Sequence, residues 1–242
     1  MTKIAVLIPF YNESDNLPLM ESVLNRLSKL NHSFKFIFCN DNSTDDTAEK
    51  LSQFMNKNNY DFEILINKKN LGHGGSLLRL SKLKKLQNFD YIFTMDFDFC
   101  YLTENLDNFF ENMNEELIVI GKRSFLDEGG FRQLISSCSE LVVILKSFKF
   151  FIDTNCPIRL YSYGLFVETW SNLPGNTLTP NILSTYLILK KNLRFKRVNL
   201  KKNNSINTNS VSWGKGFLSK KIKILAFSLK SVKQIIAFKN QE

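Results

Sequence analysis

Short apolar runs alternate with amphipathic stretches along the first 121 residues. Each apolar run spans five or six residues, which predicts a buried strand, and the stretches between them carry apolar residues three or four positions apart, which predicts helices. Strands that alternate with helices over short linkers are typical of parallel strands joined by crossover helices. The predicted strands are 3–8, 34–39, 62–66, 91–95 and 117–121, and the predicted helices are 14–30, 44–56, 75–86 and 103–113.

The periodicity changes after Gly129 and Gly130. The following residues predict a long apolar helix, a short strand, a second helix, a second strand and a polar, Asn-rich loop, at 131–152, 158–161, 180–190, 195–200 and 201–212. The fold class is therefore α/β, with an open, doubly wound and mostly parallel sheet. We expect one domain over 1–216, with halves 1–121 and 122–216, followed by a C-terminal amphipathic helix within 217–242.

The predicted C-terminal helix carries an apolar seam and many lysines. Its seam residues are spaced by three and four: Leu218, Ile222, Leu225, Leu229, Val232 and Ile236. The lysines lie largely off this seam, and basic amphipathic helices of this kind often lie on anionic membrane surfaces. Two interpretations remain open, because the same seam is equally suited to packing on the rest of the domain.

Composition narrows the class of protein. The four cysteines form no CxxC pair among the 242 residues, so neither a zinc site nor a disulfide framework is expected. No apolar stretch approaches the roughly 20 residues of a membrane span, and the chain starts without the pattern of a secretory signal. We expect a cytoplasmic protein, with peripheral attachment to the inner membrane face if the tail binds lipid.

The net charge of +9 is unevenly distributed. Residues 1–140 contain 15 Lys or Arg and 20 Asp or Glu, whereas residues 141–242 contain 17 and 3. A strongly cationic half favours phosphate on a nucleotide, a nucleic acid or an anionic membrane. The aromatic residues there are not interleaved with the basic ones as a base-stacking platform requires, so no nucleic-acid partner is expected.

Asp96 and Asp98 follow the apolar run 91–95. Open α/β sheets bind ligands at the carboxyl ends of their strands, and a few carboxylate oxygens completed by water and phosphate suit Mg²⁺ or Mn²⁺. The pair therefore predicts a metal site. The alternative is an acidic loop that caps a helix starting near Thr103.

Three further polar loops follow predicted strands of the same half. Because the carboxyl ends of parallel strands meet at one edge of a sheet, we expect all four loops to face one crevice. The four loop sequences are PFYNE at 9–13, NDNSTDD at 40–46, NKKNLGHGG at 67–75 and DFD at 96–98.

The order IPFYNE, NDNSTDDT, NLGHGG and MDFDF resembles the family 2 glycosyltransferases, which have a GT-A fold. The likeness extends through Gly121-Lys122-Arg123 and through the segment 153–160, which resembles the polyprenyl-phosphate sugar transferase branch (dolichol-phosphate mannose synthase-like). These motifs cover about residues 1–165. The resemblance implies that 1–121 bind a nucleotide sugar and that 122–216 bind the acceptor.

The resemblance also implies roles for individual residues. Asp98 would bind the metal directly, with Asp96 contacting the metal and the sugar, and His73 is expected to pack or hydrogen bond rather than to act as a catalytic base. For Asp41 a second interpretation is a helix cap ahead of Thr44. The implied donor-binding residues are Pro9, Tyr11, Asn12, Glu13, Asp41, Asn70, Gly72 and Asp96, and the glycines at 72, 74 and 75 would let backbone approach the nucleotide sugar.

The second half contributes charged candidates. Arg123 and Arg159 are expected to meet phosphate or acceptor charge, or else to form surface ion pairs. Asp153 is the candidate catalytic base for a hydroxyl acceptor; for a phosphate acceptor, which is already ionised, it would position the acceptor or cap a turn. Lys215 is expected to supply positive charge over the diphosphate.

Two departures from the family pattern affect the functional prediction. The usual Asp-Asp-Gly or Asp-Asp-Ser after the second strand is Asn40-Asp41-Asn42, and the His-x-Arg and Gly-x-Ser pattern of the lipid-sugar branch is absent. The resemblance implies an inverting, metal-dependent transferase that moves a sugar from a nucleotide diphosphate to a polyprenyl phosphate or a lipid-linked or surface glycan. The alternative hypothesis is a non-catalytic nucleotide-sugar-binding or membrane-docking protein of the same fold.

Overall fold

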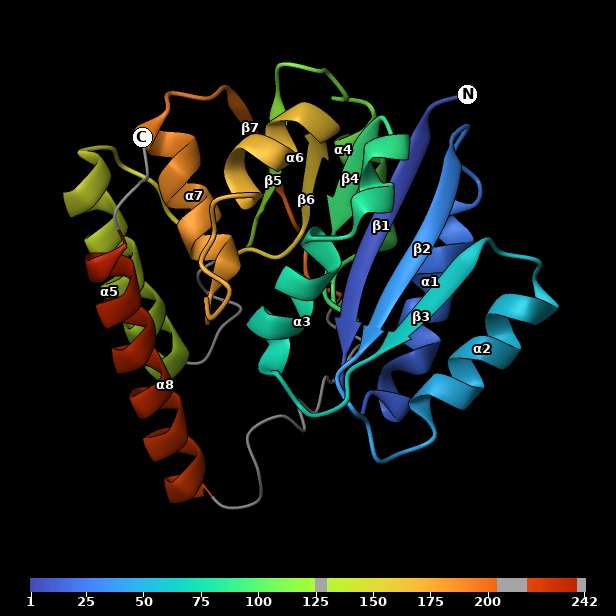
Figure 1. Ribbon diagram of the computed structural model, residues 1–242, viewed down its shortest axis with the longest axis horizontal. Coiled ribbons are helices and arrows are strands. Elements are labelled where there is room, and N and C mark those ends of the chain that lie inside the picture. Colours follow the sequence, from blue (N-terminus) through green and yellow to red (C-terminus); the bar gives the residue numbers. More distant parts are fainter. Residues whose placement is uncertain (125–129, 204–216, 239–242) are drawn as a thin grey trace.

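The computed structural model describes residues 1–124, 130–203 and 217–238, with side chains described for 1–124, 137–203 and 225–238. A seven-stranded sheet lies at its centre (Figure 1). The strands are β1 (Lys3–Phe10), β2 (Ser33–Asn40), β3 (Phe62–Ile66), β4 (Tyr91–Thr94), β5 (Ile118–Lys122), β6 (Arg159–Ser162) and β7 (Phe195–Asn199). The helices are α1 (Leu17–Leu27), α2 (Thr47–Lys57), α3 (Gly72–Ser81), α4 (Asp107–Phe110), α5 (Gly130–Ser147), α6 (Tyr163–Trp170), α7 (Pro180–Lys190) and α8 (Phe217–Ala237).

The strands lie in the order β3-β2-β1-β4-β6-β5-β7. Strand β6 is antiparallel to both of its neighbours, β4 and β5, and the other pairs are parallel. The predicted doubly wound, mostly parallel sheet is therefore confirmed. Because β1, β2 and β4 run in the same direction, the loops that follow them leave the sheet at one edge.

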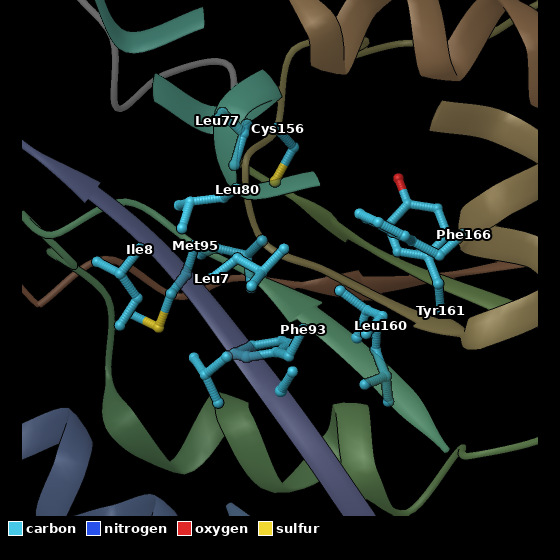
Figure 2. Packing of buried hydrophobic residues seen from close by; sticks show 14 of the residues in the cluster. Leu7, Ile8, Leu77, Leu80, Phe93, Met95, Cys156, Leu160, Tyr161 and Phe166 are labelled. Carbon is cyan, nitrogen blue, oxygen red and sulfur yellow. The ribbon is translucent and has the colours of Figure 1, made fainter. Parts of the chain in front are cut away.

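Apolar side chains cover both faces of the central strands. Residues Ile4 to Ile8 of β1 have no exposed surface, as expected for a parallel strand between two helical layers. On β4, the ring of Phe93 lies 5.6 Å from that of Phe109 in α4. Figure 2 shows Leu77 and Leu80 of α3 in the same cluster as Phe93. The core thus holds α3 and α4 rigidly beside the loops that follow β1 and β4.

Several helices differ from their predicted bounds. Helix α6 was not predicted, although Ser162 accepts a hydrogen bond from the backbone N of Leu165 (3.5 Å) as a helix N-cap does. Helix α5 ends at Ser147 rather than at residue 152, because Phe148 has a φ of +56°, a left-handed conformation that a helix cannot continue through. The predicted helices 14–30 and 103–113 each begin with a 3₁₀ turn, Ser14–Asn16 and Thr103–Leu106.

The C-terminal half of α8 packs on the domain. Ile235 and Phe238 are buried, and Nζ of Lys146 in α5 donates to the carbonyl oxygens of Ile235 (2.7 Å) and Phe238 (2.7 Å). Gln234 accepts from the backbone N of Leu178 (2.8 Å). The helix thus packs through residues off the predicted seam: the seam residues Leu225, Leu229 and Ile236 are exposed, so the expectation that the seam itself packs on the domain is wrong for this half. In the part of the chain that the structure describes, no helix has both the length and the apolar character needed to traverse a bilayer.

Two glycines form a matched test of the packing. A Cβ on Gly74 of α3 would lie 2.2 Å from the carbonyl oxygen of Leu178, whereas a Cβ on Gly164 of α6 would have nothing within 4 Å. We expect Gly74→Ala to lower the free energy of unfolding by about 2 kcal/mol, because backbone must move. Gly164→Ala should raise it by about 0.5 kcal/mol, because alanine loses less backbone entropy in a helix. Urea denaturation measures both, and equal effects would contradict the close contact.

Candidate active site

Hydrogen bonds join the loops that follow β1 and β2. Asn12, at a φ of +53°, accepts from the backbone N of Thr44 (2.8 Å) and donates its own backbone N–H to Oγ of Ser43 (3.0 Å). One residue later, the backbone N of Glu13 donates to Oγ1 of Thr47 (2.9 Å). Pro9 lies at the end of β1, paired with Cys39, and Tyr11 is half-buried. The segment 9–13 is thus held against the second loop along its length.

Asp41 joins the second loop to the third. It is 3% exposed, and its Oδ1 accepts from Nδ2 of Asn67 (2.7 Å) and from the backbone N of Leu71 (2.7 Å). Asn70 donates to the backbone carbonyl of Asp41 (3.3 Å), and its own Oδ1 accepts from the backbone N of Gly72 (3.1 Å). Because the carboxylate bonds to the third loop and helix α2 starts only at Thr47, the helix-cap interpretation of Asp41 is wrong.

Asn67 is a buried residue of this edge that the sequence analysis did not single out. It is 2% exposed, and besides Asp41 it bonds to Oγ of Ser76 (2.8 Å) and to a guanidinium nitrogen of Arg79 (2.5 Å). An amide directly after a strand was the available signal. Its side chain ties the middle of α3 to the end of β3, so that Asp41 keeps its place.

The glycines after β3 open helix α3 instead of forming a loop before it. Gly72 has a φ of +75°, which favours glycine. Gly74 makes its close approach to the backbone of Leu178, so that contact packs α3 within the domain. The expectation that these glycines let backbone approach a nucleotide sugar stays untested for Gly72.

The acidic pair follows β4, and His73 lies against it. Nε2 of His73 is 2.7 Å from Oδ1 of Asp96, which agrees with the prediction that this histidine hydrogen bonds. Burial opposes ionisation of Asp96, but the His73 ring and Arg123 outweigh it, so the pKa of Asp96 is lowered. Burial likewise opposes protonation of His73, and Asp96 outweighs it, so the pKa of His73 is raised. Asp96 is therefore anionic and oriented.

The alternative interpretation of the pair is not supported. The 3₁₀ helix Thr103–Leu106 has Leu102 at its N-cap and no side-chain cap bond, so neither Asp96 nor Asp98 caps it. Within the described ranges, no group of three or more His, Cys, Asp and Glu side chains could hold a metal ion. Two carboxylates completed by ligand phosphate and water fit the preference of Mg²⁺ or Mn²⁺, which keep several non-protein ligands.

The pKa of Glu13 is raised in part by the other carboxylates at this edge of the sheet. Its pKa is raised to about 7, first by burial, which a hydrogen bond from Asn16 opposes, and then by the charges of Asp98, Asp96 and Asp45. The first and fourth loops are thus close enough for their carboxylates to repel. A divalent cation among these carboxylates would relieve that repulsion.

The shifted pKa of Glu13 predicts a pH-dependent stability. The pKa of Glu13 in the folded protein, about 7, lies above its unfolded value of 4.5. Its contribution to the free energy of unfolding is therefore fully present below pH 4.5 and is lost as the pH rises through 7. We expect Glu13→Gln to be more stable than the wild type by up to about 3 kcal/mol at pH 8, with a difference that shrinks toward pH 5. Thermal melts across this range measure it. Parallel curves for the two proteins would contradict the shift.

Arg123 and Asp153 form an ion pair beside the acidic loops. Oδ1 of Asp153 accepts from Nη2 (2.6 Å) and Nε (3.0 Å) of Arg123, and Oδ2 of Asp153 accepts from the backbone N of Arg123 (2.8 Å). The backbone N of Asp153 donates to Oε1 of Glu140 (2.7 Å). Asp153 is 7% exposed and has a φ of +58°. Both of its oxygens thus hold Arg123.

Arg159 does not have the predicted role. It has no exposed surface, and its guanidinium donates to the carbonyl oxygens of Cys156 (2.7 Å) and Thr154 (2.7 Å) and to Oγ1 of Thr185 (2.9 Å). It therefore cannot meet phosphate or acceptor charge; it holds the segment that starts at Asp153. Lys215 lies outside the described residues, so its predicted role stays a prediction.

The chain is similar to named transferases over most of its length. It is 26% identical over 187 residues to the undecaprenyl-phosphate 4-deoxy-4-formamido-L-arabinose transferase of Photorhabdus laumondii. The matched region covers 76% of this chain and 56% of that protein. The transferase of the same name from Pseudomonas savastanoi is 26% identical over 161 residues, or 65% of this chain and 47% of that protein. The chain thus spans about half the length of these relatives.

Solved structures share the fold. Glucosyl-3-phosphoglycerate synthase from Mycobacterium tuberculosis, in complex with Mn²⁺ and UDP-glucose, superposes with a TM-score of 0.60 at 16% identity, covering 96% of this chain and 79% of that one. The mannosyltransferase PcManGT from Pyrobaculum calidifontis, in complex with GDP-mannose and Mn²⁺, superposes with a TM-score of 0.56 at 14% identity. The match covers 97% of this chain and 74% of that one. Residues 5–167, more than half of the chain, match the family model described as Glycosyl transferase family 2. The protein has the GT-A fold and belongs to glycosyl transferase family 2.

Proposed function

We propose that this protein is a metal-dependent, inverting glycosyltransferase that moves a sugar from a nucleotide diphosphate to a lipid-linked acceptor. The observation that carries the proposal is the meeting of four strand-end loops at one edge of the sheet. They are joined by the bonds of Asn12, Asp41 and His73 and crowded with the carboxylates of Glu13, Asp96 and Asp98.

Different residues of this edge would bind the metal ion and the nucleotide sugar. A bound Mg²⁺ or Mn²⁺ would neutralise the diphosphate as the sugar leaves it. Asp98 and Asp96 would hold that ion, and His73 keeps Asp96 oriented and ionised. Hydrogen-bond acceptors at this edge suit base N–H groups and ribose hydroxyls. The donor-binding set is Pro9, Tyr11, Asn12, Glu13, Asp41, Asn70 and Gly72.

The acceptor we propose is a polyprenyl phosphate. The relatives are named undecaprenyl-phosphate 4-deoxy-4-formamido-L-arabinose transferases, and residues 141–242 carry 17 Lys or Arg against 3 acids. A phosphate acceptor is already ionised, so it needs no general base, and this agrees with Asp153 having both oxygens engaged by Arg123. In this proposal 1–121 bind the donor, 122–216 bind the acceptor, and the protein works on the inner membrane face in surface-glycan synthesis.

A second candidate function is nucleotide-sugar binding without catalysis. The observation behind it is the amide at position 40, where the family has a carboxylate: its Oδ1 accepts from the backbone N of Ser43 (2.7 Å) and stabilises the loop. A binding protein would keep the donor edge and lose turnover. Transfer of sugar above background to any acceptor excludes this candidate.

Thermal shift with a panel of nucleotide diphosphates tests the proposal. We expect UDP or GDP to raise the melting temperature in Mn²⁺ and not in EDTA, because a ligand that binds the folded state stabilises it. The nucleotide that responds then identifies the donor series for transfer assays with undecaprenyl phosphate. No shift with any nucleotide in Mn²⁺ would overturn both candidate functions.

A further inference from the structure

Large apolar side chains are exposed in a stripe on α5 and in the turn that follows it. Leu141 and Leu145 are 55% and 62% exposed, and Phe148 and Phe150 are 92% and 78% exposed. Leu141 and Leu145 lie four residues apart and so share one face of α5, and Phe148 and Phe150 lie in the turn that follows. Clusters of exposed apolar side chains mark interaction surfaces more often than chance.

The backbone after α5 holds the two phenylalanines outward. Phe148 has a φ of +56° at the position after a helix where glycine is usual, and its backbone N donates to the carbonyl oxygen of Ile144 (2.8 Å). Phe151 anchors the turn from the other side: it is 3% exposed, and its ring lies 5.3 Å from that of Phe195. Glycine would fit the backbone at 148 better, so the fold itself does not require this phenylalanine.

A second exposed stripe lies on α8, which packs beside α5 along the side of the molecule opposite β3 and α2 (Figure 1). Leu225, Leu229 and Ile236 are 48%, 56% and 59% exposed. Lys230 and Lys233 are exposed next to this stripe. We call the two stripes together the apolar ridge: Leu141, Leu145, Phe148 and Phe150, with Leu225, Leu229 and Ile236.

Charge identifies the partner that fits the apolar ridge. The segments 141–152 and 225–238 contain four lysines and no Asp or Glu. A second copy of the chain would bring lysines against lysines, whereas a bilayer with anionic headgroups accepts apolar side chains below and lysines at its surface.

The amino-terminal ends of α5 and α8 lie toward the end of the sheet where β1 and β2 finish (Figure 1).

We propose that the apolar ridge docks on an anionic lipid bilayer with Phe148 and Phe150 inserted and Lys230 and Lys233 at the headgroups. This inference rests on the proposed function, because a polyprenyl-phosphate acceptor is held in a membrane. It adds the residues of α5 and the turn after it to the attachment expected from the C-terminal helix alone.

Vesicle co-sedimentation of the full chain tests the proposal. The vesicles contain equal parts of phosphatidylcholine and phosphatidylglycerol, and the variant combines Phe148→Gly with Phe150→Ser. We expect its partition coefficient to fall by about tenfold or more, the loss for one or two inserted aromatic rings. Its melting temperature should not fall, because glycine prefers the conformation at 148. Ile66→Ser on β3, which replaces another apolar side chain (62% exposed), is the matched control and should bind as the wild type does.

Charge is tested separately. Lys230→Gln with Lys233→Gln should weaken binding to the anionic vesicles and leave the weak binding to pure phosphatidylcholine unchanged. Equal binding of wild type and the phenylalanine variant, or equal binding to both vesicle types, would overturn the proposal. So would a concentration-dependent dimer in light scattering that the phenylalanine variant abolishes, since it would show that a second copy covers the ridge.

The assay contains neither donor nor acceptor, so its result is independent of catalysis. The thermal shift of the phenylalanine variant with nucleotide diphosphate and Mn²⁺ should equal that of the wild type, because the ridge lies away from Asp96 and Asp98 in the sequence and on other elements. Loss of vesicle binding with retained nucleotide binding supports the docking surface. Retained vesicle binding in this variant, with nucleotide binding intact, rejects the surface and leaves the proposed function standing.

Discussion

Asp98→Ala is expected to weaken Mn²⁺-dependent binding of the nucleotide diphosphate by about 100-fold, equivalent to about 3 kcal/mol. Few protein oxygens hold an ion of this type, and each lost carboxylate removes a large part of the affinity. Asp98 and Asp96 are the only acids of their loop, 96–98, and the charges of both reach Glu13. Isothermal titration with nucleotide in Mn²⁺ and in EDTA measures the effect.

The control for Asp98→Ala is Glu116→Gln, which removes an acid with a 77% exposed side chain in an ion pair with Arg194. It should bind nucleotide and Mn²⁺ as the wild type does. In EDTA, the wild type and Asp98→Ala should become equally weak, because the metal-dependent part is then absent from both. Undiminished affinity of Asp98→Ala in Mn²⁺ would contradict the proposed metal site.

Asp153→Asn should lower the free energy of unfolding by about 3 kcal/mol and reduce turnover. The substitution removes the charge that holds the Arg123 guanidinium, whose side chain is only 20% exposed, and breaking an ion pair at that burial is costly. Asparagine tolerates the φ of +58°, so the backbone turn is kept and only the charge changes. Urea denaturation and steady-state kinetics measure the two effects, and Asn155→Ala, an exposed neighbour, is the control.

A pH profile distinguishes the two roles of Asp153. If Asp153 positions Arg123, then Asp153→Asn and Arg123→Gln should raise the KM for the donor alike, keep the shape of the pH profile, and give less than additive losses of stability when combined. If Asp153 is the catalytic base, Asp153→Asn alone should remove the acid limb of the profile. The second result would contradict the role that the ion pair favours.

Sequence patterns located the strands but not all of their directions. All seven were predicted within two residues of their ends, because most of them are short apolar runs. The antiparallel direction of β6 was not predicted, since burial is the same for either direction. Helix α6 was missed because its start signal, Ser162, is also the last residue of β6, so no polar linker separates the two elements.

The sequence predicted those parts of the site in which polar residues directly follow a strand. It did not predict the parts that depend on contacts between residues far apart in the sequence. The loops at 9–13, 40–46 and 96–98 were found as expected. Arg159 was misassigned because the carbonyl groups that satisfy its charge belong to a bend that no periodicity describes. The pairing of Arg123 with Asp153, 30 residues apart, required the folded chain.

The reversed strand β6 also decides how the molecule can be divided. It lies between β4 and β5, so a fragment ending at Gly121 would leave β4 unpaired on one side and remove both strand partners of β5. Unsatisfied backbone groups along two bare strands favour aggregation over autonomous folding. The donor-binding half therefore depends on the chain that follows it, and the protein is expected to unfold as one cooperative unit.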